Sequence, residues 1–157
     1  MADTAKKPRP FTATEERIAR PVIKAMSLVN TWIYRLSGGR LGGRWMYGAP
    51  ILLLTTVGRK SGEKRTAPLL YLEDGPRVIL VGSQAGMSRD PLWVKNIDAN
   101  PDVEIEIGAR KRSMRARRGT SEEKADYWPA LCKMYPDYAD YQARTTRDIP
   151  VLILDPR

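Results

Sequence analysis

Apolar residues recur at helical spacing in the N-terminal part of the chain. The positions that lie three and four residues apart are Ile18, Val22, Met26, Val29, Ile33 and Leu36. Such spacing is typical of one face of a helix. Thr12 and Glu15 have capping-box spacing, and Gly38 with Gly39 provides a stop. The pattern predicts helix up to residue 37, with Pro21 either kinking it or starting a second helix.

From residue 50 onward the pattern changes to short apolar runs and alternating positions. Strands are expected over 50–57, 64–72, 78–82, 103–107, 109–118 and 151–154. The fourth of these alternates apolar and acidic residues, as a half-buried strand does. The sequence Gly58–Gly62 and the pair Asp74-Gly75 are the expected turns between the first three strands.

Two further helices interrupt this strand series. One is expected after Asp90-Pro91, and a longer one runs from the capping box Thr120–Glu123 to about Met134. This order favours an α+β domain whose mainly antiparallel sheet closes as a barrel. We divide the chain into a basic tail with the amphipathic helix, residues 1–48, and a barrel domain, residues 49–157. The tail, up to about residue 13, is expected to be mobile.

The N-terminal helix has a basic and aromatic edge. The cations and aromatic side chains that accompany the apolar positions are Lys24, Arg35, Arg40, Arg44, Trp32, Tyr34 and Trp45. A helix of this kind can lie on an anionic membrane surface. Most amphipathic helices instead pack on their own domain, and we expect that arrangement here. Peripheral contact with the cytoplasmic face of a membrane stays open as the alternative.

The amino-acid composition narrows the chemistry. The 157 residues include one cysteine and no histidine, which excludes Ser-His-Asp and Cys-His catalysis within this chain, and zinc sites of the Cys/His kind. No metal site is expected. Reactive chemistry would therefore belong to a cofactor. The net charge of +9 favours an anionic partner.

The single cysteine and the short apolar runs indicate where in the cell the protein resides. Cys132 has no partner for an intramolecular disulfide, which suits a reducing cytosol. The most apolar run, Ala49–Thr56, is too short to span a bilayer, and the first residues lack the apolar region of a signal peptide. We therefore expect a cytoplasmic protein.

Two loop segments carry candidate chemistry. The turn Gly58–Gly62, followed by Lys64 and Arg65, combines backbone N–H groups with cations and suits phosphate. It can equally be a solvated basic turn. The small residues of 82–87 follow a strand and would let a flat ligand approach the backbone. The alternative there is an ordinary connection.

An aromatic group and a basic strand complete the candidates. Tyr135, Tyr138 and Tyr141 step by three, so a helical stretch would place them on one side, lining a pocket or simply packing. The cations of 110–118 could contact nucleic-acid phosphates. However, Arg115 and Arg117 alternate with smaller or apolar residues, and no nucleic-acid motif surrounds them. A solvated strand face is the favoured interpretation, with no nucleic-acid partner.

Together, three stretches of the chain resemble the deazaflavin-dependent nitroreductase and quinone reductase family. They are LLLTTVGRKSGEKRTAPLLYLEDGPRVILVGS, DPLWVKNIDANPDVEIEI and EEKADYWPALCKMYPDYADYQARTTRDIPVLIL. The resemblance runs from about residue 50 to the C-terminus. It implies a split β-barrel of the flavin-reductase, FMN-binding type, which binds the deazaflavin coenzyme F420. It also implies hydride transfer from the reduced coenzyme to quinones and, in some members, to nitroimidazole or other nitroaromatic acceptors.

The resemblance also implies site residues by position. Those that match the motif for the phosphate and the carboxylate-rich tail of the coenzyme are Arg59, Lys60, Ser61, Gly62 and Arg65. Those that match the backbone beside the deazaflavin ring are Thr66, Ala67, Pro68 and Leu69, and the covering helix contributes Leu92, Trp93 and Asn96. The acceptor pocket would be shaped by Ser83, Tyr135, Tyr138 and Tyr141, which are the candidate catalytic residues.

Two positions depart from the family pattern. Gln84 stands where a lysine is familiar, which puts one tail contact in doubt, and Ala67 stands where asparagine is expected. The favoured function is an F420H2-dependent reductase of a menaquinone-like quinone or a nitroaromatic acceptor. The alternatives are a non-catalytic carrier of F420, use of FMN or haem on a similar barrel, and a nucleic-acid-binding domain. The physiological acceptor and the oligomeric state are left open by the sequence.

Overall fold

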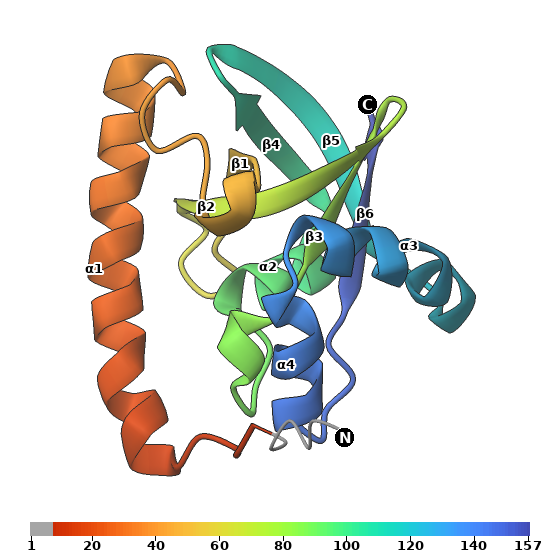
Figure 1. Ribbon diagram of the computed structural model, residues 1–157. Helices are drawn as coiled ribbons and strands as arrows, with labels where there is room; N and C mark the ends of the chain where they lie inside the picture. Colours follow the sequence, from red (N-terminus) through yellow and green to blue (C-terminus); the bar gives the residue numbers. More distant parts are fainter. Residues whose placement is uncertain (1–7) are drawn as a thin grey trace.

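A computed structural model describes residues 8–157 of the chain (Figure 1). Six antiparallel strands close into a barrel in the order β1-β2-β3-β6-β5-β4. Their bounds are β1 Ile51–Val57, β2 Lys64–Asp74, β3 Arg77–Val81, β4 Asp102–Ile107, β5 Arg110–Arg118 and β6 Val151–Pro156. The predicted strands and the antiparallel barrel are therefore confirmed. The predicted mobility of the tail lies, for residues 1–7, outside the described residues.

Alternation along the strands explains how the barrel is filled. Leu52 and Leu54 of β1 belong to the interior cluster, together with Val78, Leu80 and Ile105 from other strands. Ile51 and Leu53, which alternate with them, contact Tyr34 on the outside instead. Successive side chains of a strand point to opposite faces, so β1, which is almost wholly buried, packs on both sides.

Helices surround the barrel (Figure 1). The α-helices are α1 Ala13–Ser37, α2 Leu92–Ala99, α3 Ser121–Met134 and α4 Asp137–Arg144, and the short 3-10 turns are η1 Met46–Gly48 and η2 Gln84–Gly86. The predicted capping boxes at Thr12 and Thr120 are both formed. Within the described part of the chain, no helix is long and apolar enough to cross a bilayer.

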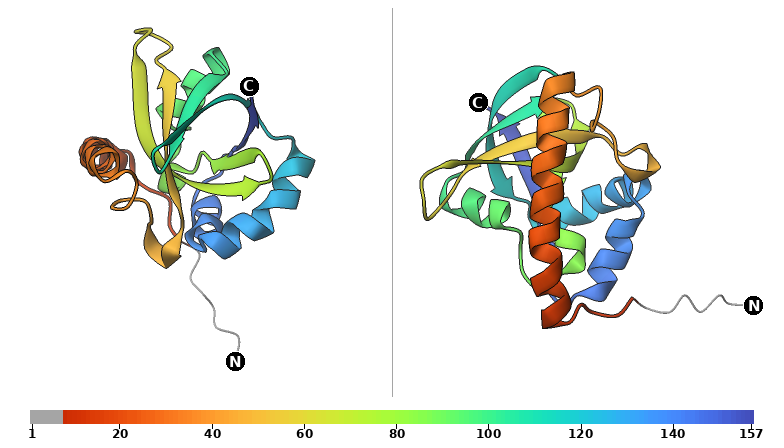
Figure 2. Two further views of the ribbon diagram at one scale, coloured as in Figure 1. Left: turned by 90° about the horizontal axis from the view of Figure 1, so that it is seen from above. Right: turned by 90° about the vertical axis from the view of Figure 1, so that its left-hand side faces the viewer.

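The long helix α1 is continuous and is attached to the barrel near its two ends (Figure 2). Pro21 lies inside it, so no second helix begins there. Near the N-terminus, the carboxylate of Glu16 accepts hydrogen bonds from the backbone N–H and the hydroxyl of Ser88, at 2.7 and 2.8 Å. Near the C-terminus, the Tyr34 hydroxyl accepts the N–H of Gly108 at 2.7 Å. Between these contacts, residues 20–26 are exposed all around the helix.

The expectation that the apolar side of α1 packs on the domain is wrong. The buried residues of α1 are Glu16, Thr31 and Tyr34, whereas Val22 and Val29 are 53% and 60% exposed. At about 100° per residue, these two valines lie on the side of the helix opposite Tyr34. The whole predicted stripe is exposed: Ile18, Val22, Met26, Val29, Ile33 and Leu36. The barrel is contacted by a mostly polar side, and the apolar side faces outward.

Candidate functional site

The loop between β1 and β2 is a compact turn that presents two cations. The Gly58 N–H donates to the Glu63 carbonyl at 2.7 Å, and the Gly62 N–H donates to the Gly58 carbonyl at 2.8 Å. Gly62 has φ 72°, which favours glycine. The side chains of Arg59 and Lys60 project into solvent and have no ion-pair or hydrogen-bond partner among residues 8–157. They are therefore free to hold an anion.

Asn96 fixes this loop from α2. Its side chain is only 5% exposed. The amide oxygen accepts the N–H of Arg59 at 3.2 Å, and the amide nitrogen donates to the Thr56 hydroxyl at 3.1 Å. Both polar ends of Asn96 are thus used within the protein. The resemblance implies Asn96 on a helix that covers the coenzyme, whereas the structure shows its side chain supporting the loop.

Two other predicted residues of the loop are also engaged locally. The Ser61 hydroxyl accepts the N–H of Glu63 at 3.2 Å, and Arg65 pairs with Glu63 at 2.8 Å on the surface. An exposed pair of this kind is worth little and exchanges easily for a better anion. Arg59 and Lys60 are therefore the stronger anion-binding candidates, and Ser61 shapes the turn.

The middle of β2 forms a platform between the loop and the barrel end. Thr66, Ala67, Pro68 and Leu69 are all half-buried there. The Thr66 hydroxyl lies 2.8 Å from the hydroxyl of its cross-strand partner Thr55. Ala67 carries no polar atom, so the departure from asparagine removes a side-chain donor at this position. The backbone and the small side chains are what this platform offers to a flat ligand.

The turn after β3 is held in an unusual conformation. Gln84 and Ala85 have φ values of 42° and 53°, the left-handed region that non-glycine residues rarely adopt. Arg147 clamps this turn: its guanidinium donates to the carbonyls of Ser83 and Met87, both at 2.8 Å. It also pairs with Asp90 at 2.8 Å. The predicted site residues Ser83 and Gln84 therefore lie on a turn whose shape the protein imposes.

The tyrosines form one cluster, although not on one helix. Tyr135 ends α3, whereas Tyr138 and Tyr141 lie on α4 after a break at Pro136. The ring of Tyr135 lies 5.0 Å from that of Tyr138 and 6.1 Å from that of Tyr141. The helix expected to end at about Met134 does end there, and the tyrosines lie side by side although one helix does not carry all three.

Burial differs within this cluster and separates the roles of its hydroxyls. Tyr135 and Tyr138 are 3% and 4% exposed, and burial raises the pKa of both phenols well above the usual value. Both therefore remain protonated at any physiological pH. The hydroxyls of Tyr135 and Tyr141 lie 3.1 Å apart, and Tyr141 is only half-buried. If the inner Tyr135 donates to Tyr141, the proton of Tyr141 is left to point outward.

The tyrosine helix packs directly on the turn that carries Ser83. A Cβ added to Gly86 would come within 2.6 Å of the Tyr141 carbonyl oxygen, so only glycine allows this approach. Arg144 of α4 also donates to the Ala85 carbonyl at 3.0 Å. The structure thus brings α4 with Tyr141 against Ala85 and Gly86, in the turn that follows Ser83 and Gln84.

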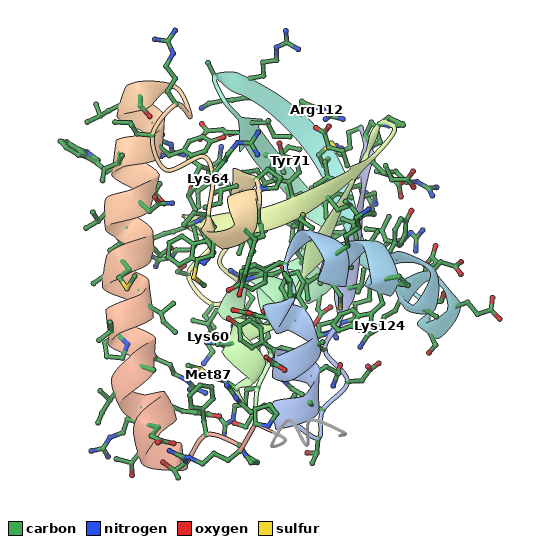
Figure 3. All side chains as sticks on the ribbon, in the orientation of Figure 1. Lys60, Lys64, Tyr71, Met87, Arg112 and Lys124 are labelled. Carbon is green, nitrogen blue, oxygen red and sulfur yellow. The ribbon has the colours of Figure 1, made fainter. Side chains whose placement is uncertain are left out.

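The two remaining predicted residues lie on α2. Leu92 is 66% exposed at the start of the helix, and Trp93 packs partly against the barrel interior. In Figure 2 the β1–β2 hairpin projects from the barrel beside α2, and Figure 3 labels Lys60 and Lys64 of that hairpin. Leu92 is available to cover a ligand, and Trp93 anchors the helix.

Sequence reasoning missed three residues that support this site. Tyr47 stacks edge-on against Tyr135 at 5.6 Å and donates to Asp137 at 3.0 Å. Arg147 and Glu16 hold the two sides of the segment that follows β3. No local motif marks any of them, because each acts across a long sequence separation.

The basic strand β5 is largely neutralised by neighbouring carboxylates. Arg115 pairs with Asp102 at 3.2 Å, Arg117 with Glu123 at 2.8 Å, and Arg118 with Asp90 and Asp98. Cations engaged in this way do not form an open phosphate-binding surface. The ion pairs support the interpretation of β5 as a solvated strand face.

Comparisons with known proteins agree with the geometry. Residues 26–156 match the family described as F420H(2)-dependent quinone reductase. A Mycobacterium tuberculosis protein named F420H(2)-dependent quinone reductase Rv1261c is 38% identical over 128 residues, which is 80% of this chain and 86% of that protein. A solved F420-H2 dependent reductase, FDR-A, is 39% identical, with a TM-score of 0.63 over 68% of this chain and 94% of that chain.

The match covers most of the chain. It includes the β1–β2 loop 58–63 (the anion loop), the turn after β3 and the tyrosine cluster. The barrel is the split β-barrel expected from the resemblance. The chain therefore belongs to the F420H(2)-dependent quinone reductase family, and is an oxidoreductase whose cofactor is coenzyme F420.

Proposed function

We propose that this protein transfers a hydride from reduced F420 to a menaquinone-like quinone or a nitroaromatic acceptor bound beside the tyrosine cluster. The observation that carries the proposal is the contact of α4 with the turn after β3, where Tyr141 and Arg144 meet Gly86 and Ala85. The proposed site has hydroxyl groups near the tyrosine cluster and the free cations Arg59 and Lys60 on the β1–β2 loop. This arrangement matches a coenzyme that has a ring and an anionic tail.

The cations and hydrogen-bonding groups of the proposed site suit the anionic tail of the coenzyme. Arg59 and Lys60 would hold its phosphate and carboxylates, because both are exposed and free of partners in the described chain. The platform Thr66–Leu69 would lie beside the ring, and Leu92 would cover it. Gln84 stands where a lysine is familiar in the family. The coenzyme tail would therefore meet a neutral hydrogen-bonding side chain at this position instead of a positive charge.

The protein's own contribution is binding, orientation and exclusion of water. When bound, reduced F420 supplies the hydride, and the acceptor takes its proton from solvent or from a nearby hydroxyl. Negative charge develops on the acceptor oxygen during this transfer. Ser83 and Tyr141 would stabilise that charge by donating hydrogen bonds, while Tyr135 and Tyr138 position the Tyr141 ring.

Titration with purified F420, followed by mixing of the reduced coenzyme with menadione, tests the proposal. We expect saturable binding and reoxidation well above the uncatalysed rate. Tight binding without turnover across several quinones and a nitroimidazole would instead favour a carrier. Absence of binding would refute both functions. The absorption spectrum of protein from its native host separates F420 from FMN and haem.

A second proposed property is peripheral attachment to an anionic membrane through α1. The specific observation is the outward apolar side of α1, on which Val22, Val29 and Leu36 are each more than half exposed. Arg17 and Lys24 lie along one flank of that side, which is complementary to anionic headgroups. A lipid-soluble quinone would then be met at the surface in which it resides.

Cosedimentation with vesicles tests this attachment. We expect binding to phosphatidylglycerol vesicles and much weaker binding to phosphatidylcholine vesicles. The pair Val22→Glu and Val29→Glu should abolish it, whereas Ala109→Glu and Ala130→Glu, which add the same charge at exposed sites elsewhere, should not. Light scattering distinguishes the rival, self-association through the same side: a dimer that the valine changes dissociate would contradict the membrane proposal.

A further inference from the structure

A cavity of about 440 Å³ lies at the end of the barrel where α1 terminates. It is open to solvent on one side and is lined by the loop Gly39–Arg44, the start of β1 and the β4–β5 turn. Its volume falls within the range of about 300–1,000 Å³ that is usual for small-molecule sites. The function proposed above makes no use of it.

Tyr71 of β2 lines this cavity, and its hydroxyl makes no hydrogen bond within the described chain. The residue is 9% exposed. Its neighbour Tyr34 differs, because that hydroxyl donates to the Glu106 carbonyl at 3.3 Å and accepts the Gly108 N–H at 2.7 Å. Figure 3 shows Tyr71 at the level of the loop that follows α1. A hydroxyl at the wall of a pocket that makes no hydrogen bond to the protein is available to a ligand group.

The other polar groups that line the cavity are cations or hydrogen-bond donors. Arg40 and Arg44 both line the cavity, and no acidic residue does. The backbone N–H groups of Gly42 and Gly43 find no acceptor within the described chain. A side chain at position 43 would collide with the Gly39 carbonyl at 2.2 Å, so the loop is tightly folded and its N–H groups are held in place. Donors without matching acceptors favour an oxyanion.

The other part of the lining is apolar. Leu41, Pro50, Ile51 and Ile107 contribute aliphatic surface. The volume of the cavity also exceeds what a bare phosphate or carboxylate group would fill. The combination suits a molecule with an anionic head and an aliphatic body.

This cavity is separate from the proposed coenzyme site. It lies at Ile51, where β1 begins, whereas the loop with Arg59 and Lys60 follows Val57, where β1 ends. Six strand residues at about 3.3 Å each place the two ends roughly 20 Å apart. One compact head group cannot contact both.

We propose that this cavity binds an amphiphilic oxyanion, a carboxylate or phosphate ester whose head contacts Arg40, Tyr71 and the Gly42–Gly43 N–H groups. The aliphatic body would lie against Leu41 and Ile51. The proposal rests on the cavity and its donors and is independent of the hydride-transfer function.

The test uses octyl phosphate below its micellar concentration, added to the ¹⁵N-labelled full chain. We expect saturable shifts of the Gly42 and Gly43 amide signals with one-to-one stoichiometry. Octanoate separates the two sources: the head group whose octyl compound binds more tightly is the one that the cavity prefers. Octanol and inorganic phosphate, which lack the head or the body, should each bind at least about tenfold more weakly.

Two conservative variants localise the binding. Tyr71→Phe keeps the ring and removes the hydroxyl. Arg40→Ala removes a guanidinium that makes no hydrogen bond or ion pair within residues 8–157. Each should weaken octyl phosphate binding by roughly fivefold to tenfold. Arg17→Ala, which removes an exposed cation near the far end of α1, should leave it unchanged, and so should the double change Arg59→Ala with Lys60→Ala.

Several results would overturn the proposal. These are the absence of amide shifts at Gly42 and Gly43, equal binding of octanol, and unchanged affinity in both the Tyr71→Phe and the Arg40→Ala variants. Inorganic phosphate that binds as tightly as octyl phosphate would refute the role of the aliphatic wall. Loss of binding on changing Arg59 and Lys60 would assign the probe to the coenzyme loop instead.

Discussion

Arg147 donates a hydrogen bond of 2.8 Å to the backbone carbonyl of Ser83. The same guanidinium holds the carbonyls of Gly82 and Met87 and pairs with Asp90. The segment before β6 therefore determines the shape of the turn after β3. The position of the Ser83 hydroxyl depends on a residue that is 64 positions away in the sequence.

Replacing Arg147 should reveal this dependence. Arg147→Ala leaves several carbonyls without their donor and removes one of the two arginine partners of Asp90. We therefore expect the free energy of unfolding to fall by about 2–4 kcal/mol. Arg147→Lys keeps the charge but not the planar set of donors, and should lose roughly half as much. Urea unfolding followed by fluorescence measures both.

The matched control is Arg115→Ala. Arg115 is an arginine whose side chain is 63% exposed and which forms a surface pair with Asp102, so its loss should cost less than about 1 kcal/mol. In the folded Arg147→Lys protein, acceptor turnover should fall more than F420 affinity. An equal fall in both, or none, would mean that Arg147 stabilises the fold without positioning Ser83.

The anion loop gives the second prediction. Replacing both Arg59 and Lys60 by alanine should weaken F420 binding by about 100-fold at low salt, because each cation would contribute a charge-assisted contact. The loss should shrink as the salt concentration rises, since both groups are exposed. Fluorescence titration measures the affinity. The pair Arg110→Ala and Lys133→Ala removes equal charge elsewhere, and a similar loss there would point to net charge alone.

Asn96 gives the third prediction. Asn96→Ala deletes the acceptor of the Arg59 N–H and the donor to Thr56, so the free energy of unfolding should fall by about 1–3 kcal/mol. F420 affinity should fall as well, because the loop loses its support. Thr56→Val removes only the partner of the amide nitrogen and should preserve affinity better. If Thr56→Val weakens F420 binding as much as Asn96→Ala does, the contact with Arg59 is not the important one.

The tyrosine pair gives the fourth prediction. Tyr141→Phe removes the outermost hydroxyl of the cluster and should reduce acceptor turnover by about tenfold with little change in F420 affinity. Tyr138→Phe also lowers turnover more than affinity, but to a smaller extent, because Tyr138 is buried among aromatic rings. Steady-state kinetics with menadione measures both variants. A larger effect at Tyr138 would reverse the roles assigned to the two hydroxyls.

The raised phenol pKa values of Tyr135 and Tyr138 predict alkaline instability. In the unfolded chain a tyrosine loses its proton near pH 10, whereas these two keep theirs in the folded protein. Their contribution to stability is therefore complete below pH 10 and declines above it, by at most about 1.4 kcal/mol per pH unit for each group. Urea unfolding between pH 8 and 11 should show a shallower decline for Tyr135→Phe with Tyr138→Phe than for the parent.

Much of the fold was accessible from local patterns. The strand runs, the turn at Asp74-Gly75 and both capping boxes are short-range signals, and the structure follows them. The end of α3 at Met134 was predicted, but the separate helix α4 was not, because its eight residues include few apolar positions. Packing of the aromatic rings brings Tyr135 together with Tyr138 and Tyr141 of α4.

The site was predictable only as a set of segments. Spacing identified the loop around Arg59 and the tyrosines. No pattern showed that the Asn96 side chain already makes its hydrogen bonds to Arg59 and Thr56 of the protein. The orientation of α1 was wrong for a related reason. Periodicity tells which residues share a side of a helix, and not whether that side is covered.

The two attachments of α1 make it a spacer of fixed length. Glu16 binds the segment after β3 and Tyr34 binds the β4–β5 turn. The 18 residue steps from Glu16 to Tyr34 span about 27 Å of helix. A single inserted residue would lengthen the helix by only about 1.5 Å but rotate one attachment by about 100° relative to the other. The helix therefore tolerates substitutions along its exposed middle and very few changes in length.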